Sequence, residues 1–231
     1  FDYVLTNFPY SEDWNKDELK DDPRFGHVDK DPRTNRGDYA YILHMYSSLA
    51  EEGQMATLAP QGVIFRQNES PVRKFMIEEN VLEAVIGLPE KLFGEDTGIA
   101  PVILILNRDK PAEREDEVMV IHAAHEDFYR EFDNKNRLEP DGVARAVKIF
   151  EEWQSEQRVC RVVDVNEIKE NDYNLNIALY VDTTEPEEEI DTVAEAKELT
   201  RLEAELGEIR DRMKDDLREL YGKEAIQYER D

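Results

Sequence analysis

The feature of this sequence that most restricts its fold is an alternation of short apolar runs with amphipathic segments over residues 1–108. Periodicity predicts the order strand, helix, strand, helix, strand, loop, strand. The expected ranges are 1–5, 39–50, 54–60, 71–80, 81–89, 90–100 and 101–108. Such alternation indicates a doubly wound α/β sheet. The connection 90–100 is too short for a helical crossover, so we expect an antiparallel last pair of strands.

Residues 1–5 predict a buried strand that runs directly into the turn Asn7-Phe8-Pro9-Tyr10. The turn therefore follows the carboxyl end of a strand, which is where ligands bind in open α/β sheets. The next stretch, 11–37, has no periodicity and predicts a long loop, a kind that is usually functional or disordered. Asp38 is placed to cap the following helix. We expect its apolar face to carry Tyr41, His44, Met45, Ser48 and Leu49.

The character of the sequence changes after Lys110, where a charged linker leads to a further strand at 118–124. Residues 140–157 predict an amphipathic helix with Val143, Val147, Phe150 and Trp153 on one face. The tail, 190–220, predicts a helix with a stripe of apolar residues spaced three and four apart, as in a coiled-coil seam. The stripe consists of Leu199, Leu202, Leu206, Ile209, Met213, Leu217 and Leu220.

The charge of the chain limits its partners. It carries 55 acidic against 29 basic residues, a formal net charge of −26. A protein that binds DNA phosphates by itself should be basic, so any nucleic-acid role requires a basic patch or a partner. The acidity indicates either a solubilising surface or a salt-loving host. A single cysteine excludes an internal disulfide and suits a reducing cytoplasm, and no apolar run approaches the ~18 residues of a membrane span.

Asn and Pro are ordinary turn residues, so the motif at Asn7 is weak evidence of catalysis when taken alone. Its position at a strand end favours a function, and the turn could support one specific kind of chemistry. The exocyclic amine of adenine is a poor nucleophile because its lone pair is delocalised into the ring. Two acceptors, the side-chain oxygen of Asn7 and the backbone carbonyl of Phe8, would favour a tetrahedral nitrogen and stabilise positive charge that develops during methyl transfer. Pro9 would stiffen the turn, and Tyr10 would offer a ring on which an extruded base could stack.

This turn resembles the Asn-Pro-Pro-aromatic motif of adenine-N6 DNA methyltransferases. The rest of the chain is similar to the modification subunit of type I restriction-modification systems. The similarity is carried by GDYAYILHM, APQGVIFR, EAVIGLPEKLFGEDTGIAPVILILNR, NKNRL and IKENDYNLNIALYVD. These stretches extend to about residue 182. Phe8 departs from the pattern, which has proline there; the backbone carbonyl is kept, but some rigidity of the turn is lost.

The resemblance implies a site-specific DNA adenine-N6 methyltransferase of the cytoplasm that uses S-adenosylmethionine. It implies DNA, a specificity subunit, a restriction (translocase) subunit and a second modification subunit as partners, and no membrane. Residues 1–110 would form the C-terminal half of a Rossmann-like catalytic core, 111–185 a family-specific extension and 186–231 a helical tail. The resemblance leaves the recognised DNA sequence open, because a separate subunit reads it.

The family places its cofactor pocket upstream of the motif, in a glycine-rich turn after the first strand. This sequence has no such turn, since Gly94 and Gly98 follow a different element. Asn7 would therefore form only the edge of the cofactor pocket. We expect the chain to be the latter part of a methyltransferase, inactive alone, with an exposed edge at its first strand. The alternative is a non-catalytic assembly module that docks a specificity subunit through its C-terminal half.

Other candidate residues have weaker patterns. Arg66 and Arg73 are candidates for contacts with DNA phosphates, with ion-paired surface residues as the alternative. His122 and His125 would be half a metal site at most, so we expect no metal. The remaining candidates are Asp164, Glu167 and Lys169 as a nuclease-like set, Cys160 as a packing residue, and Phe128 and Tyr129 as core aromatics.

Overall fold

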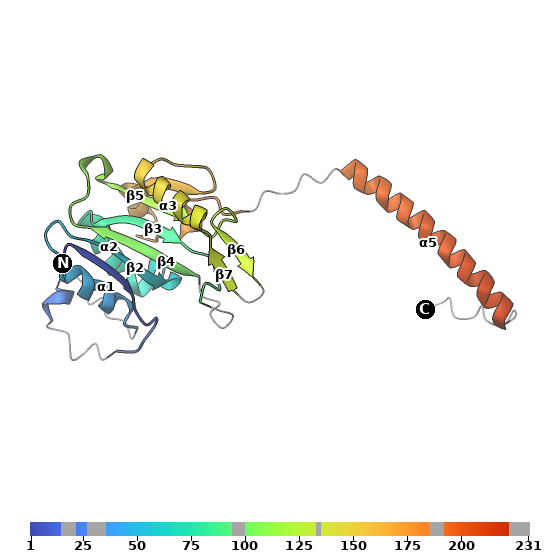
Figure 1. Cartoon of the computed structure of the whole chain (residues 1–231), viewed down its shortest axis with the longest axis horizontal. Helices are drawn as coiled ribbons and strands as arrows, with labels where there is room; N and C mark the ends of the chain where they lie inside the picture. Colours follow the sequence, from blue (N-terminus) through green and yellow to red (C-terminus); the bar gives the residue numbers. More distant parts are fainter. Residues whose placement is uncertain (15–21, 27–35, 94–99, 133–134, 185–191, 222–231) are drawn as a thin grey trace. The chain divides into compact units, whose positions relative to one another are not determined.

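The computed structural model describes residues 1–14, 22–26, 36–93, 100–132, 135–184 and 192–221. The chain divides into two units, residues 1–184 and 185–231. The first unit contains a mixed sheet with helices packed on it, and the described part of the second is a single helix (Figure 1). The α/β class and the helical C-terminal extension are therefore as the sequence predicts. Much of the loop expected at 11–37, and both Gly94 and Gly98, lie outside the described residues.

The sheet has six strands in the order β1-β2-β4-β3-β5-β8. They are β1 (Tyr3–Asn7), β2 (Gln54–Pro60), β3 (Leu82–Gly87), β4 (Pro101–Asn107), β5 (Glu117–His122) and β8 (Cys160–Asp164). Strand β4 runs antiparallel to both β2 and β3, which confirms the antiparallel pair expected from the short connection. Strands β5 and β8 extend the same sheet, so the domain boundary expected at residue 110 falls between two of its strands.

Strand β1 lies at the edge of the sheet and is not buried, so the prediction of a buried strand at residues 1–5 was wrong. Among the described strands it pairs with β2 alone, in parallel, from Tyr3 opposite Gln54 to Asn7 opposite Leu58. Phe1, Tyr3 and Leu5 are 78%, 76% and 82% exposed. Exposed and partly buried residues alternate along β1, so the two faces of the strand differ in exposure and neither is fully buried. The exposed strand edge that we expected is confirmed.

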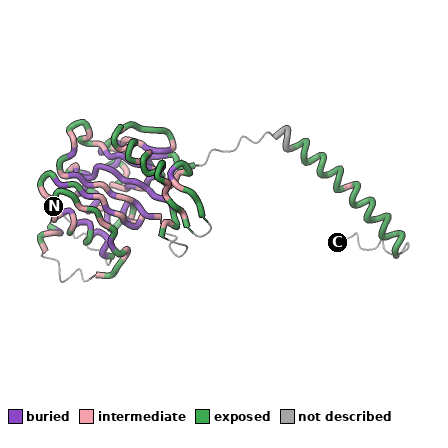
Figure 2. Tube along the Cα trace, viewed as in Figure 1, coloured by how far each residue is buried: buried purple, intermediate pink, exposed green. Residues whose placement is uncertain are grey.

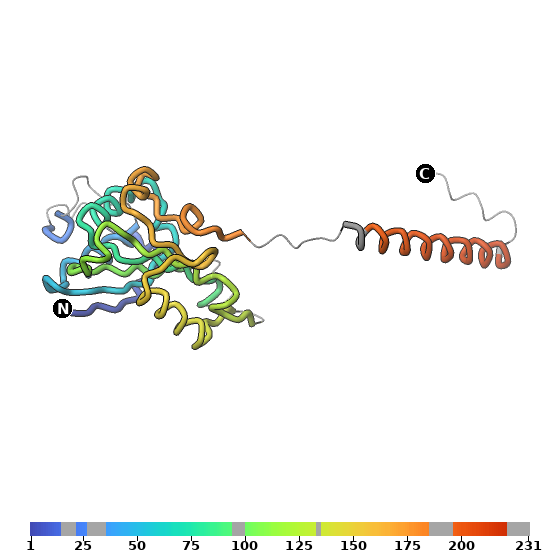
Figure 3. Tube along the Cα trace, turned by 90° about the horizontal axis from the view of Figure 1, so that it is seen from above, coloured from blue at the N-terminus to red at the C-terminus, as the bar shows by residue number. Residues whose placement is uncertain are grey.

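Helices cover the two faces of the sheet differently. α1 (Asp38–Ser47) and α2 (Ser70–Glu78) pack with Val85 and Leu104 into one core, whereas α3 (Pro140–Glu152) packs against the other face. Figure 3 shows α2 and α3 on opposite sides of the strands, and Figure 2 shows that the buried residues follow the central strands.

The faces that α1 and α3 bury differ from the predicted ones. α1 buries Tyr39, Ile42, Leu43 and Tyr46, while Tyr41 and His44 of the predicted face are exposed. α3 ends at Glu152 rather than near 157, because Trp153 adopts a left-handed conformation with a φ of 51°.

The exposed valines of α3 border a cavity. Val143 and Val147, which the sequence places on the apolar face of the helix, are 47% and 51% exposed. They line an apolar cavity of about 320 Å³ together with Ile103 and Ile105 of the sheet. The helix is therefore amphipathic as predicted, but its apolar face is only partly covered by the described residues.

Smaller elements complete the description. A separate hairpin consists of β6 (Tyr129–Phe132) and β7 (Lys135–Leu138), and the short helix α4 (Val165–Glu170) is capped by the Asp164 carboxylate. The second unit holds α5 (Thr192–Tyr221), which confirms the predicted tail helix. Among the described helices, none has the length and apolar character needed to cross a membrane.

Lys110 joins three segments at the start of the β4–β5 connection. Its Nζ donates to the Asn80 side-chain oxygen at 2.8 Å, to the Leu82 carbonyl at 3.3 Å and to the Glu117 carbonyl at 2.8 Å. Burial lowers the pKa of Lys110 to about 8. The amine therefore acts as an internal hydrogen-bond donor that ties the ends of β3 and β5 together.

We expect Lys110→Met to lower the free energy of unfolding by about 2–4 kcal/mol, because three acceptors lose their donor in a largely buried place. Urea unfolding measures this loss. The matched control is Lys148→Met, which removes an exposed ion pair with Glu152 at 3.6 Å and should change stability by less than about 0.5 kcal/mol. Equal losses for the two variants would contradict the role of Lys110.

Candidate functional site

The turn predicted as the site begins at Asn7, the last residue of β1, at the end of the sheet where the carboxyl ends of the parallel strands β1 and β2 lie side by side. Its residues differ sharply in exposure. Asn7 and Pro9 are exposed, Tyr10 is half-buried and Phe8 is only 7% exposed. Ser11 follows with a φ of 55°, in the left-handed region that residues other than glycine seldom occupy. The turn thus presents Asn7 outward and anchors itself through Phe8.

The Phe8 ring anchors the turn to helix α1. It stacks on the Tyr41 ring, with centroids 5.1 Å apart and planes 17° apart. It also meets the Tyr10 ring edge-on at 5.9 Å. Tyr41 is 38% exposed and is not among the buried residues of α1, although the sequence places it on the apolar face of the helix. The residue that departs from the motif is therefore a packing residue.

Tyr10 combines a half-buried ring with a buried hydroxyl. Among the described residues, the hydroxyl oxygen has no hydrogen-bond partner. Burial raises the pKa of Tyr10, and the negative charge of Asp38 raises it further. Tyr10 therefore stays protonated near neutral pH and carries no charge at the turn.

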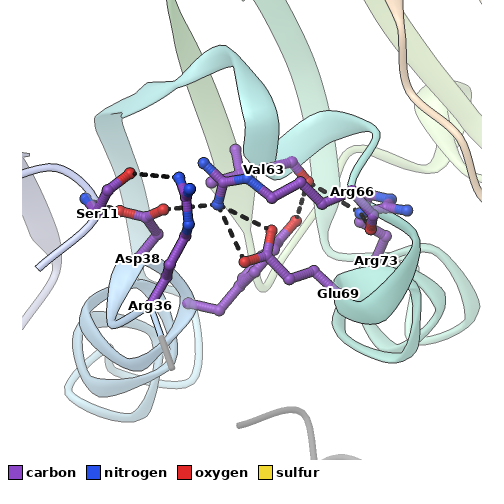
Figure 4. Close-up of polar contacts among 8 residues, drawn as sticks. Ser11, Arg36, Asp38, Val63, Arg66, Glu69 and Arg73 are labelled. Carbon is purple, nitrogen blue, oxygen red and sulfur yellow. Dashed lines mark hydrogen bonds and ion pairs between the residues drawn. The ribbon is translucent and has the colours of Figure 1, made fainter. Parts of the chain in front are cut away.

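A buried cluster of charged side chains lies behind the turn (Figure 4). Asp38, the first residue of α1, accepts from the Ser11 backbone N–H at 2.6 Å and from Arg66 Nη1 at 2.7 Å. Arg66 Nη1 also donates to Glu69 Oε1 at 3.0 Å. Both carboxylate side chains are essentially buried, with exposures of 0% and 1%. Asp38 was expected to cap α1, but Gly37 occupies the cap position and the carboxylate serves the turn instead.

Arg66 and Arg73, the candidates for DNA contacts, belong to the interior. The side chain of Arg66 is 19% exposed and ion-paired, as in the alternative weighed from the sequence. Arg73 is fully buried, so it presents no surface to a DNA phosphate. Its guanidinium donates to the carbonyls of Tyr173 at 2.7 Å, Arg66 at 2.9 Å and Val63 at 3.1 Å.

The remaining candidates have ordinary structural contacts. His125 pairs with Asp127 at 3.3 Å, and burial lowers the pKa of His122. Glu167 pairs with Arg161 at 2.7 Å, and Cys160 is buried. Phe128 is 1% exposed and belongs to the core, as predicted, whereas Tyr129 is only partly buried and the prediction for it was wrong. No three His, Cys, Asp or Glu side chains gather around a metal-sized site in the part of the chain that the structure describes.

Comparison with known proteins decides the family. The family model of the N-6 DNA methylases matches residues 1–189. The chain belongs to this family. The methylase subunit of the type I restriction enzyme MjaVII from Methanocaldococcus jannaschii is 34% identical over 221 residues, which cover 91% of this chain. The methylase subunit of MpnII from Mycoplasma pneumoniae is 32% identical and covers 83% of it. The resemblance stated from the motifs is thereby confirmed.

The fold of this family member is also that of a solved relative. The crystal structure of a type I restriction-modification methyltransferase subunit from Streptococcus thermophilus matches 78% of the chain with a TM-score of 0.71 and 33% identity. The chain spans 37% and 35% of the two curated relatives and 38% of the solved one.

Asp38 and Glu69 belong to the buried charged cluster behind the turn, which the sequence did not reveal. The spacing of Arg66 and Glu69, three positions apart, is a signal for a local ion pair. The partners of Asp38 lie 27 and 28 positions away, so no local pattern in the sequence indicates them.

We expect Phe8→Ala to lower the free energy of unfolding by about 2–4 kcal/mol, because a stacked and nearly buried ring leaves a cavity against Tyr41. Thermal or urea unfolding measures the change. Phe132→Ala removes a ring that is 48% exposed and should cost less than about 1 kcal/mol. A Phe8 variant as stable as the Phe132 variant would show that the ring does not anchor the turn.

Proposed function

We propose that this N-6 DNA methylase acts in the transfer of a methyl group to the N6 amine of adenine in DNA, as part of the modification subunit of a type I restriction-modification system. The turn at residues 7–10 is the proposed amine-binding site. The observation that carries the proposal is its geometry: Asn7 is exposed at the carboxyl end of the parallel pair β1–β2, while the neighbouring Phe8 is locked into the core.

The roles proposed for the turn follow from its chemistry. The side-chain oxygen of Asn7 and the backbone carbonyl of Phe8 accept hydrogen bonds from the adenine amine and stabilise the positive charge that develops there. Pro9 holds the backbone of the turn. Tyr10 offers its exposed portion to the extruded base, and such stacking typically contributes about 1–3 kcal/mol.

The described residues fit the adenine side of this reaction, and on the cofactor side they supply only Asn7 at the edge of a pocket. No glycine-rich turn lies beside Asn7 among the residues that the structure describes. When bound, S-adenosylmethionine would supply a methyl group activated by its sulfonium for transfer to the amine. We propose that Asn7 orients the amine for that transfer, and that the 231-residue chain alone is inactive.

A function without catalysis is the second candidate, and helix α5 favours it. Its apolar stripe is exposed over the whole length, from Leu199 at 59% to Leu220 at 73%. A helix whose other faces are charged needs a surface on which to bury such a stripe. We propose that the stripe docks a helical part of the specificity subunit, while the acidic faces steer the choice of partner. The alternative is that α5 folds back on its own protein.

The proposed setting of the whole protein is that of its relatives, which are named methylase subunits of type I restriction enzymes. DNA, the specificity subunit, the restriction subunit and a second copy of the modification subunit are the partners that we propose, in the cytoplasm. A chain with a net charge of −26 needs such partners to hold DNA.

In the intact methyltransferase with its partners, Asn7→Ala should lower the single-turnover rate of methyl transfer about 10²-fold or more, by analogy with the loss of one oxyanion-hole donor. The measurement is transfer of labelled methyl groups to unmodified genomic DNA. The control is Asn166→Ala, which changes an exposed asparagine beside β8 at the opposite edge of the sheet. A normal rate for Asn7→Ala would refute the assignment of this turn.

For the tail, replacing Leu206 and Ile209 together with Asp should abolish co-purification with the specificity subunit, because charges then stand in the middle of the apolar stripe. The melting transition of the α/β unit should stay unchanged. Replacing Glu205 and Glu208, which are also exposed on α5, with Gln is the matched control and should leave the complex intact. Survival of the complex after the Asp changes would favour the fold-back alternative.

A further inference from the structure

We propose that Asp38 is a positioning residue for the methyl-transfer turn: its buried carboxylate clamps the backbone after Tyr10 to Arg66 and so fixes where Asn7 and Tyr10 point. This inference rests on the proposed function of the turn. It concerns a residue outside the motif, 28 positions from Arg66 and 27 from Ser11.

The first step of the argument is the burial of the Asp38 charge. The residue is 0% exposed, and a buried carboxylate is tolerated only when its oxygens are paired or hydrogen-bonded. One oxygen accepts from the Ser11 N–H and the other from Arg66 Nη1. If the turn moved away, the buried Asp38 carboxylate would lose the hydrogen bond from the Ser11 N–H, and this loss makes the movement energetically costly.

The second step is the conformation of Ser11, the residue after the turn. Its φ of 55° is unfavourable for a residue with a side chain, so specific contacts must maintain it. The Asp38 carboxylate takes the Ser11 N–H at 2.6 Å, and Arg36 Nη1 donates to the Ser11 Oγ at 3.1 Å. The direction of the backbone after Tyr10 is therefore fixed by the side chains of Arg36 and Asp38.

The third step is that α1 holds the turn at two points on one helical face. Asp38 and Tyr41 are three positions apart, which places them side by side on a helix. Asp38 binds the backbone after Tyr10, and Tyr41 stacks on Phe8 before it. The core residues Tyr39, Ile42 and Leu43 keep α1 fixed on the sheet, so the turn inherits the rigidity of the core.

Glu69 provides a control that distinguishes a positioning role of Asp38 from a contribution to stability alone. It is as buried as Asp38 and binds the same Arg66 nitrogen, at 3.0 Å, but it belongs to the segment between β2 and α2. Removing either carboxylate leaves Arg66 with one anionic partner in the interior. Only the change at Asp38 also releases the Ser11 N–H.

The test compares Asp38→Ala, Asp38→Asn and Glu69→Ala in the intact methyltransferase with its partners. Melting temperature, the KM for S-adenosylmethionine and the single-turnover rate on unmodified genomic DNA are measured below the melting transition of every variant. We expect Asp38→Ala and Glu69→Ala to lower the melting temperature by similar amounts. We expect Asp38→Ala to lower the single-turnover rate at least about tenfold with the KM unchanged, and Glu69→Ala to change the rate less than about twofold.

Asp38→Asn should restore part of the rate, because an amide oxygen can still accept the Ser11 N–H while its NH₂ group faces Arg66. Equal rates for Asp38→Ala and Glu69→Ala, whether both normal or both reduced, would overturn the positioning role. The Asn7→Ala variant is run alongside. If Asn7→Ala is slow and Asp38→Ala is normal, only the positioning inference fails; if Asn7→Ala is normal, the proposed function of the turn fails.

Discussion

The buried pairing of Asp38 with Arg66 is the interaction on which the site end of this fold depends. It links the turn after β1 to the start of α1 and to the segment that follows β2. Arg73 continues the connection, since it donates to the carbonyls of Arg66 and Tyr173. A buried ion pair adds little net stability compared with apolar packing, but removing one partner is costly. Its contribution here is geometric, because it holds the turn after β1, the start of α1 and the segment after β2 in fixed positions relative to one another.

Elements with a strong local signal were predictable from the sequence. Strands β2 and β4 follow from their apolar runs, α2 follows from Pro71 at its start, and α5 follows from its seam. The antiparallel direction of β4 followed from the length of the connection alone. These features depend on spacing and chain length, which the sequence displays directly.

The wrong predictions concern residues whose environment is set by distant segments. Tyr41 was placed on the apolar face of α1, yet it is 38% exposed and its ring serves the turn by stacking on Phe8. Asp38 stands where a helix cap is common, yet its carboxylate is used by Ser11 and Arg66. In both cases the local propensity was real, but tertiary contacts from about thirty residues away determined the outcome. The position of the turn at a strand end was predictable, whereas its support was not.

The substitution at Phe8 and the acidity of the chain have a common consequence for how such a site must work. Without a second proline, the turn takes its rigidity from packing and from a buried charge rather than from the backbone itself. That solution engages Arg66 in an ion pair with Asp38, and Arg73 nearby is fully buried as well. Side chains engaged in this way offer little positive surface to DNA phosphates, and the net charge of −26 opposes DNA further. Under the proposed function, a turn of this construction would hold an adenine that is delivered to it, and the grip on the DNA would come from other surfaces, which we assign to partner subunits.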